Sequence, residues 1–336
     1  MNEDPLPRIW LLLGPRRGDN NQLLALGEGL GLPFETRTLD YRKSARAIMR
    51  LVPRSIRHLD PQSRAWLAPP WPDLVIGIGR RSVPVARWIR EQSKGAARLV
   101  RLGHPRAPSQ WFDLVITTQQ YPVRDAKNVV RLPIAMNRFA LPPAPTAAEQ
   151  SSLDSLPRPH FLLSLGGNAP MWRLDHQALG QAVQTLLARA RRERGSLIVI
   201  PSPRTSDEAL ALVRAEIGKS GAGIVAGNSL RYAVALADAD EHFVTADSVS
   251  MISEAIATGK PVGLIPVEPD ARGHLRLRGD PEDSRLRDPR RFWLHVEALG
   301  LVGNVAHPRK GRVDDPVAMA VDAIRARLGA RFAPTR

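Results

Sequence analysis

The hydrophobic positions of this chain follow two alternating patterns along its whole length. Short apolar runs rich in Val, Ile and Leu predict buried strands, and longer stretches with apolar residues at helical spacing predict amphipathic helices. In the first half, these patterns predict strands at residues 8–14, 35–39, 73–79, 97–102 and 113–118, and helices at 20–30 and 83–92. Strands that alternate with helices predict a parallel, doubly wound α/β sheet.

The second half repeats this alternation. Its predicted strands are residues 160–165, 196–200, 223–226, 241–245 and 262–266. A helix predicted from about Asp175 has its apolar stripe at Leu179, Ala182, Val183, Leu186 and Leu187. The charge-dense stretch 272–291 predicts an exposed loop, and residues 316–328 predict a final helix.

A proline-rich segment separates the two halves. Pro142, Pro143 and Pro145 stand there among small residues, a composition typical of an interdomain linker. With 336 residues, the chain also exceeds the usual size of a single core. The expected organisation is an N-terminal domain at 1–137, a linker at 138–157, a C-terminal domain at 158–312, and a C-terminal helix at 313–336 that packs back on the N-terminal domain.

Composition excludes several classes of protein. The chain has no cysteine, which excludes disulfides, thiol catalysis and Cys-ligated metals and fits a reducing compartment. The apolar run Ile9–Leu13 is too short for a signal peptide or a membrane span. We therefore expect a globular cytoplasmic protein, with the bacterial cytosol as its compartment.

The net charge of +15 includes one dense basic segment, Tyr41–Leu59, which has no acidic residue. Its basic residues, interleaved with apolar ones, are Arg42, Lys43, Arg46, Arg50, Arg54 and Arg57. Such a segment suits an anionic membrane surface, which would make the protein peripheral on the inner membrane. A solvated helix face is the ordinary alternative. Nucleic acid is not expected as a partner, because the segment lacks the interleaved aromatic residues that stack on bases.

The most informative candidate site is Val244–Val262. A predicted buried strand passes there into a helix through Asp247, Ser248 and Ser250, and the helix ends at Gly259. Helix starts at the carboxyl ends of parallel strands attract phosphate, because their first amides are unpaired and the helix dipole favours negative charge. An ordinary capped helix is the alternative interpretation.

The first half has two further strand ends with candidate residues. After the first strand, Gly18 allows a close backbone approach to a ligand, and Asp19 and Gln22 present polar groups. The dinucleotide pattern GxGxxG is absent, so no nicotinamide cofactor is expected. Arg80 and Arg81 follow a second glycine turn and suit phosphate or carboxylate.

Five other residues, in three places along the chain, are candidates. Gly166, Gly167 and Asn168 stand where a phosphate-binding turn would in the second half, and Arg204 follows the next strand. His104 is the histidine best placed for catalysis, although a lone loop histidine is ordinarily a surface residue. Nothing in the sequence requires a metal.

Five blocks of sequence resemble the bacterial branch of the Elm family, named for a plant mitochondrial-fission factor. They are GDNNQLLALGEGLGLP (18–33), DLVIGIGRRSVPVARWIR (73–90), SLGGN (164–168), SPRT (202–205) and VTADSVSMISEAIATGKPV (244–262). The family resembles GT-B glycosyltransferases, which implies two Rossmann-like domains with parallel sheets facing a central cleft. It also implies a nucleotide-sugar bound mainly by the C-terminal domain. By this resemblance, the residues near the diphosphate, sugar or ribose are Gly166, Gly167, Asn168, Asp247, Ser248, Ser250 and Glu254.

These inferences converge on a metal-independent glycosyltransferase with a nucleotide-sugar donor and no cofactor. Arg204, the Gly166–Asn168 turn and the helix start at Asp247–Ser250 would stabilise the departing diphosphate. Asp19 or His104 would take the proton of an acceptor, which would be envelope or lipid-linked if the basic segment touches membrane. Two other interpretations stay open: a non-catalytic GT-B-like adaptor that binds partners, and a sugar-nucleotide epimerase or hydrolase.

Overall fold

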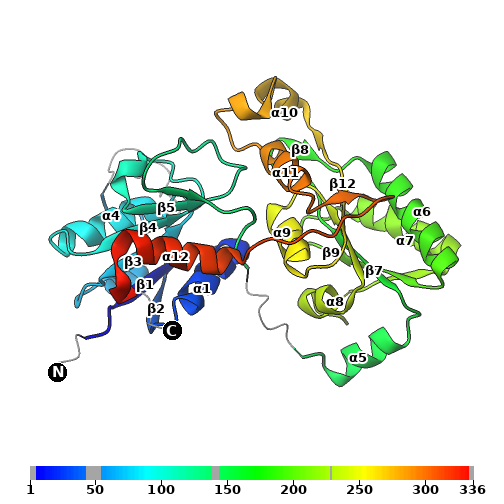
Figure 1. Ribbon diagram of the computed structural model, residues 1–336, viewed down its shortest axis with the longest axis horizontal. Coiled ribbons are helices and arrows are strands. Elements are labelled where there is room, and N and C mark those ends of the chain that lie inside the picture. Colours follow the sequence, from blue (N-terminus) through cyan, green and yellow to red (C-terminus); the bar gives the residue numbers. More distant parts are fainter. Residues whose placement is uncertain (1–4, 43–53, 138–143, 228, 333–336) are drawn as a thin grey trace. The chain divides into compact units, whose positions relative to one another are not determined.

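The structure is a computed structural model that describes residues 5–42, 54–137, 144–227 and 229–332. The chain divides into two compact units (Figure 1). Unit 1 comprises Met1–Arg138 and Asp314–Arg336, and unit 2 comprises Phe139–Val313. Each unit has its own parallel sheet and its own apolar core.

Unit 1 is built on a six-stranded parallel sheet with the order β2-β1-β3-β4-β5-β6. Its strands are β1 (Ile9–Leu13), β2 (Phe34–Thr38), β3 (Leu74–Ile78), β4 (Arg98–Leu102), β5 (Leu114–Thr117) and β6 (Val129–Arg131). Its helices are α1 (Arg17–Gly29), α3 (Pro61–Ala65), α4 (Ser82–Gln92) and α12 (Pro316–Leu328). The direction of the strand order reverses between β1 and β3, which creates a topological switch point, where doubly wound folds bind ligands.

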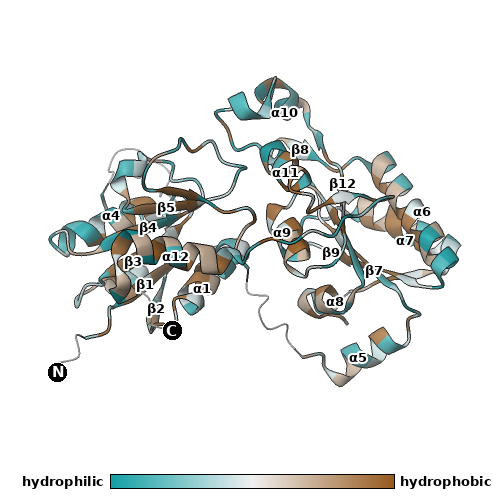
Figure 2. Cartoon of the chain, in the orientation of Figure 1, coloured by the Kyte–Doolittle hydropathy of each residue, from teal (hydrophilic) through white to brown (hydrophobic). Residues whose placement is uncertain are grey.

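Apolar side chains cover both faces of the unit 1 sheet, because successive strand residues point to opposite sides. On one face, α1 and α12 pack together, and Leu26 and Ile324 are fully buried in their shared cluster. On the other face, α4 contributes Val85 and Ile89. The final helix of the chain is therefore part of the unit 1 core. Figure 2 shows the hydrophobic colour on the central strands and hydrophilic colour over many of the loops.

Unit 2 has a second six-stranded parallel sheet with the order β10-β9-β7-β11-β12-β14. Its strands are β7 (His160–Leu165), β9 (Ser196–Pro201), β10 (Gly223–Val225), β11 (Glu241–Thr245), β12 (Val262–Ile265) and β14 (Gly303–Asn304). A small antiparallel pair is formed by β8 (Trp172–Arg173) and β13 (Glu268–Pro269). The helices are α5 (Ala147–Asp154), α6 (His176–Glu193), α7 (Asp207–Ser220), α8 (Tyr232–Asp238), α9 (Val249–Ala257), α10 (Ala271–Arg276) and α11 (Pro289–Ala298). Here the switch point lies between β7 and β11.

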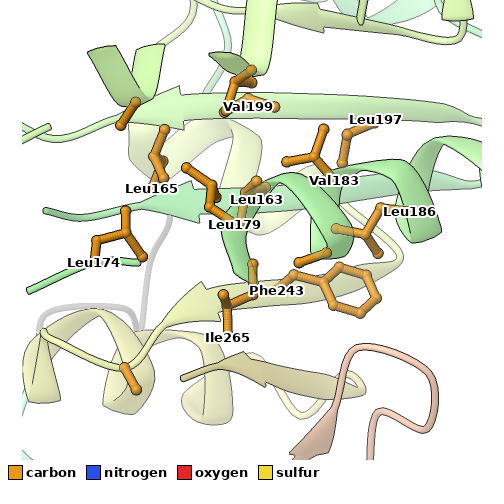
Figure 3. Close-up of a cluster of buried hydrophobic side chains, with 14 of the residues drawn as sticks. Leu163, Leu165, Leu174, Leu179, Val183, Leu186, Leu197, Val199, Phe243 and Ile265 are labelled. Atoms are coloured by element: carbon orange, nitrogen blue, oxygen red, sulfur yellow. The ribbon is translucent and has the colours of Figure 1, made fainter. Parts of the chain in front are cut away.

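The predicted apolar stripe of α6 forms the centre of the unit 2 core. Figure 3 shows Leu179, Val183 and Leu186 directed onto the strands, toward Leu163 of β7 and Phe243 of β11. All five side chains are fully buried. The helix begins after the predicted Asp175, whose side chain accepts a hydrogen bond from the amide of Ala178. The predicted α/β class with two parallel sheets is therefore confirmed.

The prediction of an exposed loop at residues 272–291 is correct only for the middle of the stretch, residues 277–288, where many side chains are exposed. The segment contains most of α10 and the start of α11, and Asp288 and Arg291 are buried. The guanidinium of Arg291 donates to backbone carbonyls of the same segment, including that of Ser284 at 2.7 Å, and Arg290 pairs with Asp288 at 2.7 Å. A charge-dense stretch is ordered here because its arginines satisfy internal acceptors.

Part of the segment expected to be a linker forms the helix α5. It begins with a capping box between Thr146 and Glu149, in which each side chain bonds the backbone of the other. Glu149 also pairs with Arg231 at 2.6 Å, just before α8. This ion pair attaches α5 to unit 2.

Candidate functional site

The carboxyl ends of β7 and β11 meet at the switch point of unit 2. The hydroxyl of Thr245 accepts a hydrogen bond from the amide of Gly166 at 2.7 Å and donates one to Oδ1 of Asp247 at 2.7 Å. All three residues are buried. A Cβ on Gly166 would lie 2.0 Å from that carboxylate oxygen, so this close approach requires glycine. The turn after β7 and the approach to α9 are therefore locked together.

Arg204 pairs with the same carboxylate. Its Nη2 lies 2.6 Å from Oδ2 of Asp247, although the two groups are not aligned as a hydrogen bond. Burial raises the pKa of Asp247, while the Thr245 hydrogen bond and the Arg204 charge act in the opposite direction. The side chain of Arg204 is 42% exposed. The site thus presents an accessible guanidinium that a buried carboxylate holds beside the glycine turn.

The loop after β9 packs closely on the glycine turn. A Cβ on Gly167 would lie 1.9 Å from the carbonyl oxygen of Arg204. The hydroxyl of Thr205 contacts the carbonyl oxygens of Leu165 at 2.8 Å and Gly166 at 2.7 Å. These contacts fix the backbone of the turn beside Arg204.

Asn168 has a structural role in the turn. It is exposed, and its Oδ1 accepts a hydrogen bond from the amide of Leu174 at 3.1 Å. Its side-chain oxygen is therefore used to hold the chain after the turn.

The two predicted serines differ in role. Ser248 is the N-cap of α9, and its Oγ accepts from the amide of Met251 at 3.4 Å, as the ordinary capping interpretation expects. Ser250 lies in the first turn and is half-buried. Its spacing of four residues from Glu254 puts the two side chains on one face of α9.

Glu254 has an environment that disfavours its charge. Burial raises the pKa of its carboxyl to about 7, and the hydrogen bond with Tyr232 only partly opposes this. Tyr232 begins α8, and its hydroxyl lies 3.5 Å from the hydroxyl of Ser164 in β7. A carboxyl kept in such surroundings at a strand end is typical of a binding or catalytic site.

Replacing Glu254 by Gln is expected to stabilise the protein at pH 8. The folded-state pKa of about 7 exceeds the ordinary value of 4.5, so the folded state binds more protons between these values. Stability should therefore fall as the pH rises from about 4.5 to 7 and stay level above that. Glu254→Gln removes this loss and should raise the free energy of unfolding at pH 8 by about 1–3 kcal/mol. Urea unfolding at pH 5 and pH 8 measures the difference.

The control for this experiment is Glu297→Gln, at an exposed position of α11. It should leave the pH dependence of unfolding unchanged. Equal pH slopes for the wild type and Glu254→Gln would mean that Glu254 is ionised freely in the folded state.

The carboxyl ends of β1 and β3 meet at the switch point of unit 1. The side-chain amide of Asn20 bonds both the amide and the carbonyl of Gly14, at 2.9 and 2.8 Å. Gly79 has a φ of +76°, and Oδ2 of Asp19 lies 3.8 Å from the place that its Cβ would take. The structure therefore brings the predicted Asp19 next to the glycine turn that precedes Arg81.

Arg101, which the sequence analysis missed, is fully buried in β4 at this edge. Its guanidinium donates to Oγ of Ser82 at 2.8 Å and to the carbonyl oxygen of His104 at 3.3 Å. Burial lowers its pKa to about 10, and Asp19 is the first of the charges that act in the opposite direction. It stays charged at neutral pH. Its signal in the sequence is an arginine within the otherwise apolar run at 99–102.

The geometry favours Asp19 over His104 as a base. Nδ1 of His104 accepts a hydrogen bond from the amide of Arg106 at 2.8 Å, so the neutral ring is assigned its proton on Nε2. Burial, with Arg106 and Arg101 adding to it, lowers the pKa of His104 to about 4. A ring in this state has little capacity to take a proton near neutral pH.

The other predicted residues of this edge lie on α1 and before α4. Gly18 and Arg80 are exposed, and Gln22 is half-buried. The guanidinium of Arg81 lies over the ring of Tyr41, 5.0 Å from its centroid. The structure thus brings Arg81 and Asp19 to one edge, together with the buried Arg101.

The basic segment is only partly described. Arg42, Arg54 and Arg57 are exposed, and Arg54 lies 3.7 Å from Glu91 of α4. The remaining basic residues, which fall outside the described ranges, are Lys43, Arg46 and Arg50. Contact of this segment with a membrane surface stays a prediction.

The described residues provide neither a cluster of metal ligands nor a membrane-spanning helix. Within those ranges, no group of three or more His, Cys, Asp and Glu side chains is arranged to hold a metal ion. In the same part of the chain, no helix combines the length and the apolar character that crossing a membrane needs.

Comparison with known proteins identifies similar sequences and folds. The family model described as Mitochondrial fission ELM1 matches residues 17–279. A curated relative, the Mitochondrial fission protein ELM1 of Arabidopsis thaliana, is 27% identical over 222 residues, which cover 58% of this chain and 51% of the relative. The chain thus spans about half the length of that relative.

Solved structures share the architecture at low sequence identity. The UDP-GlcNAc 2-epimerase of Methanocaldococcus jannaschii has a TM-score of 0.52 and 9% identity, over 95% of this chain and 99% of that one. The S. aureus MnaA–UDP co-structure has a TM-score of 0.50 and 11% identity, over 96% and 97%. Similarity at this level shows the fold alone, which is GT-B-like: two Rossmann-like units, each with a parallel sheet.

Proposed function

This chain belongs to the mitochondrial fission ELM1 family, and from this premise and its GT-B-like fold we propose that unit 2 binds a nucleotide-sugar. We further propose that the protein transfers the sugar to an acceptor bound by unit 1. Because the structural neighbours share little sequence, the support comes from the residues of this chain.

The observation that carries the proposal is the state of Glu254. Its carboxyl is held in surroundings that raise its pKa to about 7, and its hydrogen bond with Tyr232 only partly compensates. An apolar residue would stabilise α9 better, so a ligand that bonds this carboxyl is its best explanation. Vicinal hydroxyls of a ribose or sugar are suitable donors, because each can bond a carboxylate oxygen.

The rest of the edge suits the diphosphate. The backbone of Gly166 and Gly167 is fixed by Thr245 and Thr205, and Arg204 presents an exposed guanidinium beside it. A guanidinium and helix-start amides, such as those of the first turn of α9, stabilise a departing diphosphate without requiring a metal. Asp247 then has a supporting role, because it is buried and holds Arg204 in place.

In the proposed transfer, the acceptor oxygen attacks the anomeric carbon of the sugar. The bond from that carbon to the diphosphate oxygen breaks, and the diphosphate leaves with the electron pair. The proton of the acceptor hydroxyl passes to a carboxylate, for which Asp19 is the candidate in unit 1. The positive charge of Arg101 interacts with the negative charge of Asp19 at this edge.

A thermal-shift screen tests donor binding. One of UDP, GDP, ADP, CDP or their sugar conjugates is expected to stabilise the protein, by about 2.7 kcal/mol at 100 times its Kd. Glu254→Ala should remove the shift, measured from its own unliganded melting temperature, and the exposed Glu297→Ala should retain it. Product analysis with the nucleotide that binds then separates transfer from epimerisation or hydrolysis. The absence of a shift with every nucleotide would favour the non-catalytic adaptor instead.

A further inference from the structure

The start of α1 carries two positive charges, which the N-terminus of a helix disfavours. Arg16 is its N-cap and Arg17 its first residue, no side chain caps it, and Asp19 is the acidic residue of the first turn. The positive end of the helix dipole therefore lies beside two guanidinium groups. Three helices of unit 2, α6, α7 and α9, begin instead at Asp175, Ser206 and Ser248, and each of these side chains caps its helix. Helix α8 also begins at an arginine without a side-chain cap, but this residue, Arg231, pairs with Glu149 at 2.6 Å.

The neighbouring loop of unit 1 adds two more cations. Strands β1 and β3 pair in parallel, so the loops that follow them leave the same edge of the sheet (Figure 1). Arg80 and Arg81 lie in the second loop, and the first turn of α4 has no acidic residue. No ion pair with a described residue is formed by the four arginines of these two loops, Arg16, Arg17, Arg80 and Arg81.

A buried charge beneath this edge is the second, independent observation. Arg101 is 1% exposed, and its Nη1 bonds Ser82, the first residue of α4. Its Nε has no hydrogen-bond partner among the described residues. A buried guanidinium with an unsatisfied donor is unfavourable unless a further negative charge is present nearby. Asp19 supplies one such charge, and the loops of this edge carry Arg16, Arg17, Arg80 and Arg81.

We propose that the carboxyl edge of the unit 1 sheet, between the first turn of α1 and the loop before α4, binds a phosphate or diphosphate group. The open amides of the first turn of α1 donate to its oxygens, and Arg17 and Arg81 pair with its charge. Arg101 does not contact the group but adds a fixed positive charge below it. In one respect this inference rests on the proposed function: in a transferase, the group belongs to the acceptor, whose hydroxyl then lies near Asp19.

The test is calorimetric titration of the full chain with inorganic pyrophosphate. The double variant Arg17→Gln/Arg81→Gln is expected to bind at least about tenfold more weakly, because two charge-assisted contacts are lost. The control is Arg98→Gln, an exposed arginine at the other end of β4 that pairs with Asp113 and should change nothing. The double variant should melt close to the wild type, since the repulsion removed at the helix start offsets the lost contact of Arg81 with Tyr41.

A unit 2 variant, Arg204→Gln, separates the two sites. Pyrophosphate binding that persists in Arg204→Gln and is lost in Arg17→Gln/Arg81→Gln supports the inference, even if no nucleotide binds and the proposed function fails. If the double variant loses as much affinity for the nucleotide-sugar as for pyrophosphate, the phosphate bound at this edge belongs to the donor rather than to the acceptor. Binding that depends on Arg204 alone, or no binding of pyrophosphate at all, would overturn the inference.

Discussion

Substitution of Gly167 by Ala is expected to lower the free energy of unfolding by about 3 kcal/mol or more and to abolish nucleotide binding. The new Cβ would lie 1.9 Å from the carbonyl oxygen of Arg204, which is a backbone atom. No rotation of a side chain relieves such a contact, so the turn after β7 or the loop after β9 must move. Either movement displaces the guanidinium of Arg204 from the turn.

Gly218→Ala is the matched control. Gly218 lies near the end of α7, where a Cβ would meet nothing within 4 Å. Alanine there should stabilise the helix by about 0.5–1 kcal/mol, because it restricts the unfolded chain. Chemical unfolding should therefore show a lower free energy of unfolding for Gly167→Ala and a higher one for Gly218→Ala. A Gly167→Ala protein as stable as the wild type would show that the two loops do not pack as described.

Thr245→Val is expected to lower the free energy of unfolding by about 2–4 kcal/mol. The two side chains have nearly the same shape, so the loss comes from hydrogen bonds. The buried amide of Gly166 loses its acceptor, and Oδ1 of Asp247 loses a donor. The pKa of Asp247, which burial already raises, should rise further, since the Thr245 hydrogen bond is the first of the groups that oppose this shift. The stability loss should therefore be greatest at high pH.

The comparison variant is Thr185→Val, on the exposed side of α6. Its hydroxyl bonds the carbonyl of Gln181 within its own helix, so the change should stay within about 0.5 kcal/mol. Urea unfolding at pH 6 and pH 8 measures both variants. Comparable small losses in the two would mean that Thr245 does not connect the glycine turn to Asp247.

The fold was predictable because its signals are periodic. The stripe of Leu179, Val183 and Leu186 has helical spacing, and the cap at Asp175 precedes it, so local pattern and packing agree. The helical ends of the stretch 272–291 were mistaken for loop because their charge was taken as a sign of exposure. Its Arg291 is buried among backbone carbonyls, and a sequence does not show which acceptors a guanidinium will meet.

The candidate sites were predictable only in part. Strand ends followed by glycine pointed to Gly166, Gly167 and Asp19, because parallel sheets bring carboxyl ends to one edge. Thr245 and Tyr232 were missed, since a threonine ending a strand and a tyrosine starting a helix have ordinary structural explanations. Arg101 was visible in the sequence as a charge inside an apolar strand. Its role could not be predicted, because it depends on the loop residues that its guanidinium bonds.

Hydrogen–deuterium exchange of the full chain, with and without the nucleotide-sugar that binds best, locates the donor directly. The account predicts slower exchange at the Gly166–Asn168 turn, at Ser202–Thr205 and in the first turn of α9, with unit 1 unchanged in the absence of acceptor. Slower exchange confined to unit 1, or a bound nucleotide that leaves these three segments unchanged, would contradict the assignment of the donor site to unit 2.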